Sequence, residues 1–314
     1  MINIYKSIND SSNALEKIDT IENGCWINLV APTDQELLLV SKKTGVPIEF
    51  LRAPLDDEET SRLDIEDNNV LVIVDIPFTE MEENSLTYDT YPLGIIHTEN
   101  EIITVCLKNS KLLNDFVDGK IKSFFTYKRS RFILQILNRI ATYYLLYLRQ
   151  IDKKSLMVEK RLQKSMRNKE LIQLLSLEKS LVYFSTSLKA NEITLEKMMK
   201  LDFITKYEED RDVLEDVIIE NKQAIEMANI YSNILTGTMD FFASVISNNL
   251  NIVMKLLASI TIVMSIPNMI SGLFGMNFNQ LPLVNNPNGF WITVGIIGVL
   301  CAITAYYLYR KDMF

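Results

Sequence analysis

Histidine and cysteine are scarce in this sequence. Its 314 residues include one histidine, His97, and three cysteines, Cys25, Cys106 and Cys301. The cysteines lie far apart and form no C-x-x-C pair, so neither a disulfide framework nor a thiolate zinc site is predicted. This usage suits a reducing compartment. His97 falls in a predicted strand, and we expect its role to be structural.

Motifs for phosphate binding and catalysis are also missing. The sequence has no G-x-G-x-x-G, no G-x-x-x-x-G-K-[ST] and no G-x-S-x-G, so neither a nucleotide cradle nor a nucleophile elbow is indicated. No set of nucleophile, base and oxyanion donors can be assembled, so we expect no enzyme and no cofactor. The net charge of -8 argues against nucleic acid as a partner.

The amino terminus, MINIYKSINDSS, lacks a positively charged region followed by an apolar core. No cleaved signal peptide is predicted, and the soluble part should begin in the cytosol.

The first 120 residues or so predict a small mixed α/β domain. Thr33-Asp34-Gln35-Glu36 has the spacing of a capping box, which opens a helix that Gly45 and Pro47 close. Strands are expected at Met1–Tyr5, Cys25–Val30, Asn69–Ile76, Thr87–His97 and Glu101–Leu107.

Proline and glycine nearly vanish from the middle of the chain. From Lys120 to Ile266 there is no proline and only one glycine, Gly237, and apolar residues recur at helical spacing. We expect a hairpin of two helices, Ser123–Ser165 and Asn168–Leu201. A third helix should begin near Glu208 and run about 90 Å into a bilayer, because a helix rises about 1.5 Å per residue.

Two segments are long and apolar enough to cross a membrane core of roughly 30 Å, Leu256–Phe274 and Phe290–Tyr309. Lys255 precedes the first, a basic tail follows the second, and the loop between them contains no lysine or arginine. Both flanks should therefore be cytoplasmic, with the end of the first span at the outer mouth.

The first span carries a stripe of small and polar residues at spacings of three and four. The stripe consists of Ala258, Thr261, Ser265, Asn268 and Gly272. It should face another helix or water, because lipid would leave its polar groups unpaired. Packing between membrane helices is the alternative to lining a pore. We expect Pro267 to be a tolerated kink rather than a gate element.

Gly275-Met276-Asn277 ends the first span. One interpretation is a ring of asparagine side chains, one per subunit, that binds the water shell of a divalent cation. Magnesium holds its waters tightly, so neutral carbonyl oxygens suit the hydrated ion. The other interpretation is an ordinary helix stop signal.

This GMN tripeptide lies before a second span within the last 40 residues or so. Together with CWINLVAPT at 25–33, LDDEETSRLDIED at 55–67, SNNLNIVMKLLASITI at 247–262 and SGLFGMNF at 271–278, it resembles the CorA family of magnesium transporters. The resemblance implies a funnel-shaped homopentamer with an α+β cytosolic domain, a long helical stalk and two transmembrane helices. It would be a multi-pass protein of the plasma membrane, with both termini cytoplasmic.

The resemblance also implies roles for residues along the pore. Gly275 through its carbonyl and Asn277 through its amide would form the selectivity filter with Met276, while Asn251 and Met254 would lie at an inner hydrophobic gate. Two acidic clusters could sense cytosolic magnesium, one containing Asp56 and Asp57 and the other Asp212 and Asp216. Counting back from GMN in the family pattern selects Asp216. The alternative for both clusters is a solvated surface.

The outer loop departs from the family pattern. Many relatives carry an acidic residue after the loop proline, but this chain reads Leu281-Pro282-Leu283 and its loop has no acid. Electrostatic recruitment of cations should therefore be weaker, which leaves Mg²⁺, Co²⁺, Ni²⁺ and Zn²⁺ open as cargo. Met276 favours magnesium as cargo, because the zinc-transporting branch of the family commonly has another aliphatic residue at this position.

The sequence thus predicts a channel that takes up hydrated Mg²⁺ and is gated by cytosolic divalent cation. A zinc or other transition-metal transporter, with or without proton coupling, is the alternative within transport. A membrane-anchored coiled-coil scaffold or sensor without conduction is the alternative from another class. The expected parts are a cytosolic α/β domain, a helical hairpin, a stalk continuing into the first span, an outer loop, a second span and a tail, at 1–120, 121–205, 206–277, 278–289, 290–309 and 310–314.

Overall fold

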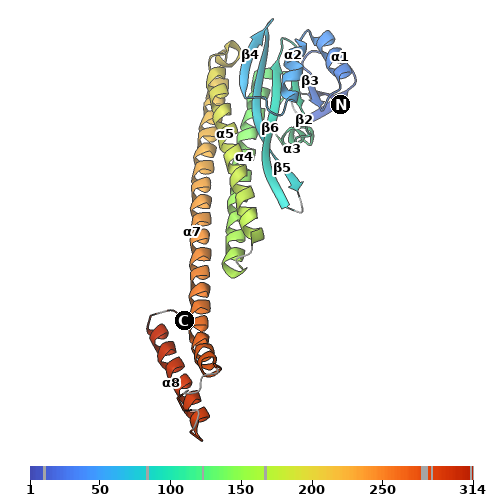
Figure 1. The fold of residues 1–314 in the computed structure, drawn as a ribbon. Coiled ribbons are helices and arrows are strands. Elements are labelled where there is room, and N and C mark those ends of the chain that lie inside the picture. The colour runs from blue at the N-terminus through green and yellow to red at the C-terminus, as the bar shows by residue number, and fades with distance from the viewer. Residues whose placement is uncertain are drawn as a thin grey trace. The chain divides into compact units, whose positions relative to one another are not determined.

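The computed structural model describes residues 1–9, 12–82, 85–121, 124–165, 168–276, 282–283, 286–311 and 313. Two compact units divide the chain, Met1–Gly237 and Thr238–Phe314. They are described one at a time (Figure 1).

The first unit is built on a seven-stranded sheet with the order β2-β1-β3-β7-β6-β5-β4. Strands β3 and β7 pair in parallel, and the other neighbours pair antiparallel. The strands are β1 (Ile2–Asn9), β2 (Ser12–Ile18), β3 (Trp26–Val30), β4 (Arg62–Glu66), β5 (Asn69–Glu82), β6 (Ser85–His97) and β7 (Ile102–Cys106).

One face of the sheet is covered by short helices (Figure 1). These are α1 (Asp34–Thr44), α2 (Ile48–Arg52) and the 3-10 helix η1 (Ala53–Leu55). The capping box predicted at Thr33 and Glu36 is confirmed, and Gly45 ends α1 in the left-handed conformation at φ 73°. Leu37 and Val40 of α1 pack with inward residues of the central strands to form the core of this face.

The other face packs against α3 (Lys111–Val117), α4 (Arg129–Ser165) and α5 (Asn168–Met198). Trp26 is fully buried here, with its ring edge-on to Phe116 and Phe132, and its indole N–H donates to Thr104 at 2.8 Å. The amide of Asn191 in α5 both accepts from the backbone N–H of Asp75 and donates to its carbonyl, each at 2.8 Å. This pair of bonds fixes α5 on the sheet.

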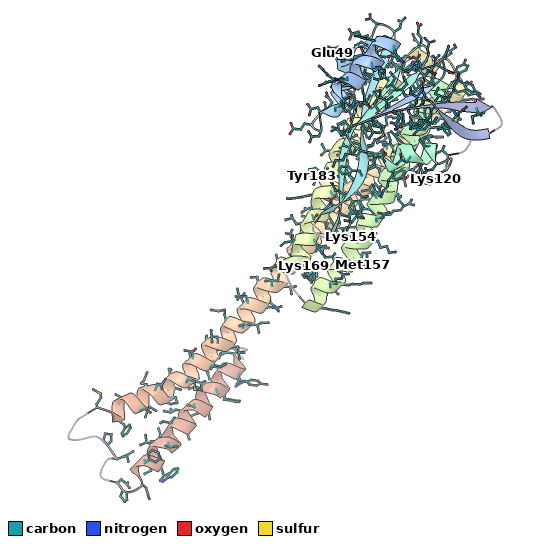
Figure 2. The ribbon with its side chains drawn as sticks, turned by 90° about the vertical axis from the view of Figure 1, so that its right-hand side faces the viewer. Glu49, Lys120, Lys154, Met157, Lys169 and Tyr183 are labelled. Atoms are coloured by element: carbon teal, nitrogen blue, oxygen red, sulfur yellow. The ribbon has the colours of Figure 1, made fainter. Side chains whose placement is uncertain are left out.

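The hairpin of α4 and α5 supports the start of α7 (Glu208–Phe274), which follows the short helix α6 (Asp202–Thr205). Asn221 of α7 donates to the carbonyl of Leu188 at 2.9 Å, and Thr236 donates to Glu178 at 2.7 Å. Because the partners run in opposite directions, α5 and this part of α7 are antiparallel. Figure 2 shows Lys154 and Lys169 near the end of the hairpin.

The second unit contains the rest of α7 and α8 (Gly289–Arg310). Two helices of the described chain, α7 and α8, are long and apolar enough to cross a membrane. The predicted long helix is confirmed, and it continues through Pro267 to Phe274.

Some details of the sequence prediction were wrong. The first helix of the hairpin begins at Arg129 rather than Ser123, because Phe124 is instead buried among the rings of Phe116 and Phe132. Residue 123 itself lies outside the described residues. Strands β2 and β4 and the helices α2 and α3 were not predicted.

Candidate functional site

One face of the membrane part of α7 is turned toward the rest of its unit. Ser259 is fully buried there and donates to the carbonyl of Met313 at 2.8 Å, next to the end of α8. Val263, Ile266, Pro267 and Ile270 are the other residues of this stretch that are not fully exposed. Their spacing of three and four places them on one side of the helix, which we call the α8 face.

A proline lies inside this face. Pro267 has no backbone N–H, so the carbonyl of Val263, four residues earlier, loses its helical partner. The thiol of Cys301 in α8 donates to that carbonyl at 3.7 Å. A side chain of the second span thus supplies the hydrogen bond that the proline removes. Such a replacement is needed because no water is available in apolar surroundings to bind the free carbonyl.

The predicted polar stripe lies roughly opposite to the α8 face, given about 100° of rotation per helical residue. Its members, together with the predicted gate residues, are all exposed in the single chain. These residues are Asn251, Met254, Ala258, Thr261, Ser265, Asn268 and Gly272. The second span therefore leaves the whole stripe uncovered.

The polar groups of the stripe differ in their need for a partner. The hydroxyl of Thr261 donates to the carbonyl of Leu257 at 2.8 Å, and that of Ser265 donates to Ile262 at 2.7 Å. Within the described part of the chain, the amide of Asn268 has no such bond. An unpaired amide in lipid costs on the order of several kcal/mol. Helix packing alone therefore does not explain why a residue as polar as Asn268 lies here.

The GMN tripeptide begins one residue after α7. Gly275 donates to the carbonyl of Ser271 at 2.9 Å, and Met276 donates to Leu273 at 3.3 Å. Gly275 does not adopt the left-handed conformation that favours glycine in a stop signal. Asn277, the third predicted filter residue, lies outside the described residues.

The outer loop is held tightly where it enters α8. The carbonyl of Leu283 lies 2.2 Å from the position that a Cβ on Gly289 would occupy, so only glycine fits. Leu283 itself has a φ of 70°, and its carbonyl accepts from Asn286 at 3.2 Å. This turn sets where the second span begins.

Aromatic side chains lie at both ends of α8, a signal that our reading of the sequence missed. Phe290 and Trp291 lie at its start, and Tyr306, Tyr307 and Tyr309 lie near its end, all of them exposed. Rings with a polar edge are favoured at the two surfaces of a bilayer. This pattern could have been read from the sequence and supports the assignment of α8 as a span.

The predicted sensing residues are all exposed. Asp56 and Asp57 follow η1, and Asp212 and Asp216 lie on the outer side of α7. The described residues of one chain include no group of three or more His, Cys, Asp or Glu side chains placed to hold a metal ion. A shared site between two copies stays a prediction.

His97 ends β6, as expected for a structural residue. Its ring stacks on Phe203 with centroids 4.2 Å apart. Burial, together with the nearby charge of Arg129, lowers the pKa of His97 to about 4.

The chain matches the family model described as CorA-like Mg²⁺ transporter protein over residues 22–310. It is 30% identical to the cobalt/magnesium transport protein CorA of Methanocaldococcus jannaschii, with 99% of each chain covered. The chain belongs to the CorA family. Magnesium and cobalt transport across a membrane is the activity of that family, and the resemblance inferred from the sequence is confirmed.

Solved CorA structures agree with this assignment. The complete structure of the Methanocaldococcus jannaschii CorA magnesium transporter matches 100% of this chain, and 99% of that chain, with a TM-score of 0.84 at 28% identity. The soluble domain of the same protein matches 78% of this chain, and 97% of that chain, with a TM-score of 0.68. The structure of full-length CmaX matches 100% of this chain, and 97% of the CmaX chain, with a TM-score of 0.70 at 16% identity. At this identity the match shows only that the fold is shared.

Proposed function

We propose that the protein is a channel for hydrated divalent cations that takes up Mg²⁺ down its electrochemical gradient. Both of the relatives described as cobalt/magnesium transport proteins support Mg²⁺ first and Co²⁺ second as cargo. The observation that carries the proposal is the stripe containing Asn268, which is polar, exposed and turned away from α8. Such a surface needs water or another copy of the chain against it.

Five copies of the chain around one axis would satisfy the stripe. The seven stripe and gate positions would then line a water-filled path, and α8 would form an outer ring toward lipid, where its aromatic ends favour the bilayer surfaces. We propose a plasma-membrane protein with both termini in the cytoplasm, because basic residues flank the spans on that side only. The domain limits expected from the sequence are proposed as the working parts of this channel.

The filter would be the ring of Gly275, Met276 and Asn277. Amide and carbonyl oxygens can accept hydrogen bonds from the waters around Mg²⁺ without stripping them, which suits an ion that dehydrates reluctantly. Gly275 does not adopt the left-handed conformation, so the usual backbone reason for a glycine at a helix end does not apply, and this supports a role for Gly275 in the filter.

The filter is tested by Mg²⁺ flux into proteoliposomes. The variant Asn277→Ala should lose at least about tenfold in flux, which corresponds to a barrier raised by about 1.4 kcal/mol. Asn288→Ala is the matched control, because it removes the same amide from an exposed position that makes no side-chain cap bond to α8. Unchanged flux in Asn277→Ala would remove the filter assignment, whereas absence of protein-dependent Mg²⁺ flux in the wild type would favour a non-conducting scaffold.

A further inference from the structure

A hollow in the first unit lies where the starts of α4 and α7 meet the end of β6. Its volume is about 1000 Å³, at the upper end of the range of about 300–1,000 Å³ that is usual for small-molecule sites. It lies outside the predicted ion path, because every residue around it belongs to the first unit.

Three of the four cations that line this hollow have no carboxylate within ion-pair distance among the described residues, although Arg129 is close enough to Glu101 for its charge to offset part of the rise that burial causes in the pKa of that carboxyl. Lys128, Arg129 and Lys206 form no ion pair with any described residue, whereas Arg131 is paired with Asp210 at 3.2 Å. Arg129 is the first residue of α4, whose first turn contains no acid. Arg129 adds its charge to the positive end of the α4 dipole, and Glu208 and Glu209 on the same hollow offset only part of this positive charge. An anion would be held by that potential and by the free N–H groups of the helix.

Aromatic rings stand beside these cations. Tyr207 is 56% exposed and Tyr127 is 43% exposed, although both lie within the first unit and line the hollow. The stacked rings of His97 and Phe203 line it as well. The ammonium of Lys206 lies over one face of the Tyr207 ring, 5.6 Å from the centroid. A nucleobase stacked on the other face would lie next to phosphate-binding cations, the arrangement used for single-stranded nucleic acid.

Two carboxylates on the same hollow restrict the ligand further. Glu208 and Glu209 open α7, are exposed and line the hollow. They would repel a bare polyphosphate. Mg²⁺ is commonly held by one or two carboxylates together with phosphate oxygens. A ligand that brings its own Mg²⁺ therefore matches both signs of charge on this surface.

We propose that this hollow binds the Mg²⁺ complex of a nucleoside triphosphate. The base stacks on Tyr207, the phosphates contact Lys128, Arg129 and Lys206, and Glu208 and Glu209 face the metal. Such a site would let the protein respond to the Mg²⁺ that is bound to nucleotide, separately from free Mg²⁺. The proposal does not depend on how ions pass through the membrane part.

Isothermal titration calorimetry with ATP, on the full chain in detergent at constant free Mg²⁺, tests the site. Wild-type protein should show saturable binding, and Arg129→Gln should weaken it by at least about tenfold. Lys42→Gln is the matched control, because Lys42 is an exposed cation on α1 away from the hollow. Thermal unfolding of both variants checks that they fold. Absence of saturable binding, or equal affinity in Arg129→Gln and Lys42→Gln, overturns the proposal.

A second arm separates recognition of the base from recognition of phosphate. Tyr207→Ala should weaken ATP binding by about five- to a hundredfold, whereas Tyr207→Phe should retain it. Neither change should alter the binding of inorganic tripolyphosphate. If tripolyphosphate binds as tightly as ATP to the wild type, the nucleotide assignment is wrong.

A third arm tests the metal. Removing Mg²⁺ with a chelator should weaken ATP binding to the wild type, because Glu208 and Glu209 then face uncompensated phosphate charge. The double variant Glu208→Gln, Glu209→Gln should lose most of this Mg²⁺ dependence. Equal affinity for ATP with and without Mg²⁺ in the wild type contradicts the proposed ligand.

Discussion

At the scale of single residues, His97 shows how a buried group ties stability to pH. Its ring stacks on Phe203, and burial together with the charge of Arg129 lowers its pKa to about 4. In the unfolded chain the pKa returns to about 6.5, so the unfolded state binds the proton more tightly. The stabilisation from neutral His97 is therefore complete above pH 6.5 and is lost as the pH falls toward 4.

We expect the wild-type protein to lose about 3 kcal/mol of stability between pH 6.5 and pH 4 through this one group, and His97→Phe to lose much less. Phenylalanine keeps the stacked ring and removes the proton site. The measurement is the thermal unfolding midpoint of the detergent-solubilised chain at each pH. Parallel pH profiles for the two proteins would show that His97 does not carry the dependence.

The residues of the predicted site came from two sources, the spacing of residues in the first span and the resemblance to the CorA family, which selected Asn251, Met254 and Asp216. The stripe followed from intervals of three and four, and the GMN tripeptide from its place before a second span. The hydrogen bond between Cys301 and Val263 joins residues far apart in the chain, so no local sequence pattern predicts it. The buried Ser259 was also missed, because a serine beside Thr261 and Ser265 reads as one more small polar residue until α8 covers it.

At the scale of elements, the two faces of the membrane part of α7 differ in what they contact. The α8 face packs against the second span, and the opposite stripe remains exposed. A channel requires the stripe to stay polar, whereas a scaffold requires only that helices pack.

Replacing Asn268 with leucine should therefore lower Mg²⁺ flux by about tenfold, because it removes the polar group that packing leaves unpartnered. Ile266→Leu on the α8 face is the control, since it conserves volume and polarity and should leave flux near wild type. The assay is uptake of Mg²⁺ by proteoliposomes containing equal amounts of protein. Full flux in Asn268→Leu would show that the stripe is a surface for helix packing rather than the lining of a pore.

The elements themselves were predicted unevenly. The hairpin and the long helix were found because their apolar residues recur at helical spacing without proline. The two strands that were missed, β2 and β4, are the two edges of the sheet. Edge strands bury little and carry charges, as SNALEKI and RLDIE show, so their apolar alternation is faint. Ile65 in β4 is even 62% exposed.

At the scale of the whole molecule, one copy of the chain is chemically incomplete. Its polar stripe has no cover, and its predicted sensing carboxylates do not gather into a metal site among the described residues. Both features are explained if neighbouring copies meet along the stripe and across the acidic clusters.

Magnesium should then protect the assembled protein from proteolysis by bridging carboxylates of neighbouring copies. We expect Asp216→Asn to need about tenfold more Mg²⁺ for half-maximal protection from trypsin, since it removes one charged ligand. Asp240→Asn is the control, because Asp240 is an exposed carboxylate farther along α7. An identical Mg²⁺ dependence in the two variants would assign Asp216 to ordinary solvated surface.

The three cysteines give the protein a natural position for a chemical probe. Cys25 and Cys106 are fully buried, and burial raises the pKa of both thiols, so they should resist alkylation in the folded state. Cys301 is only partly buried, in the second span. A small membrane-permeant thiol reagent should therefore react at Cys301 alone, and only when the bond from this thiol to the Val263 carbonyl opens. The rate of this reaction would report how often α7 and α8 separate at Pro267, without first building a cysteine-free background.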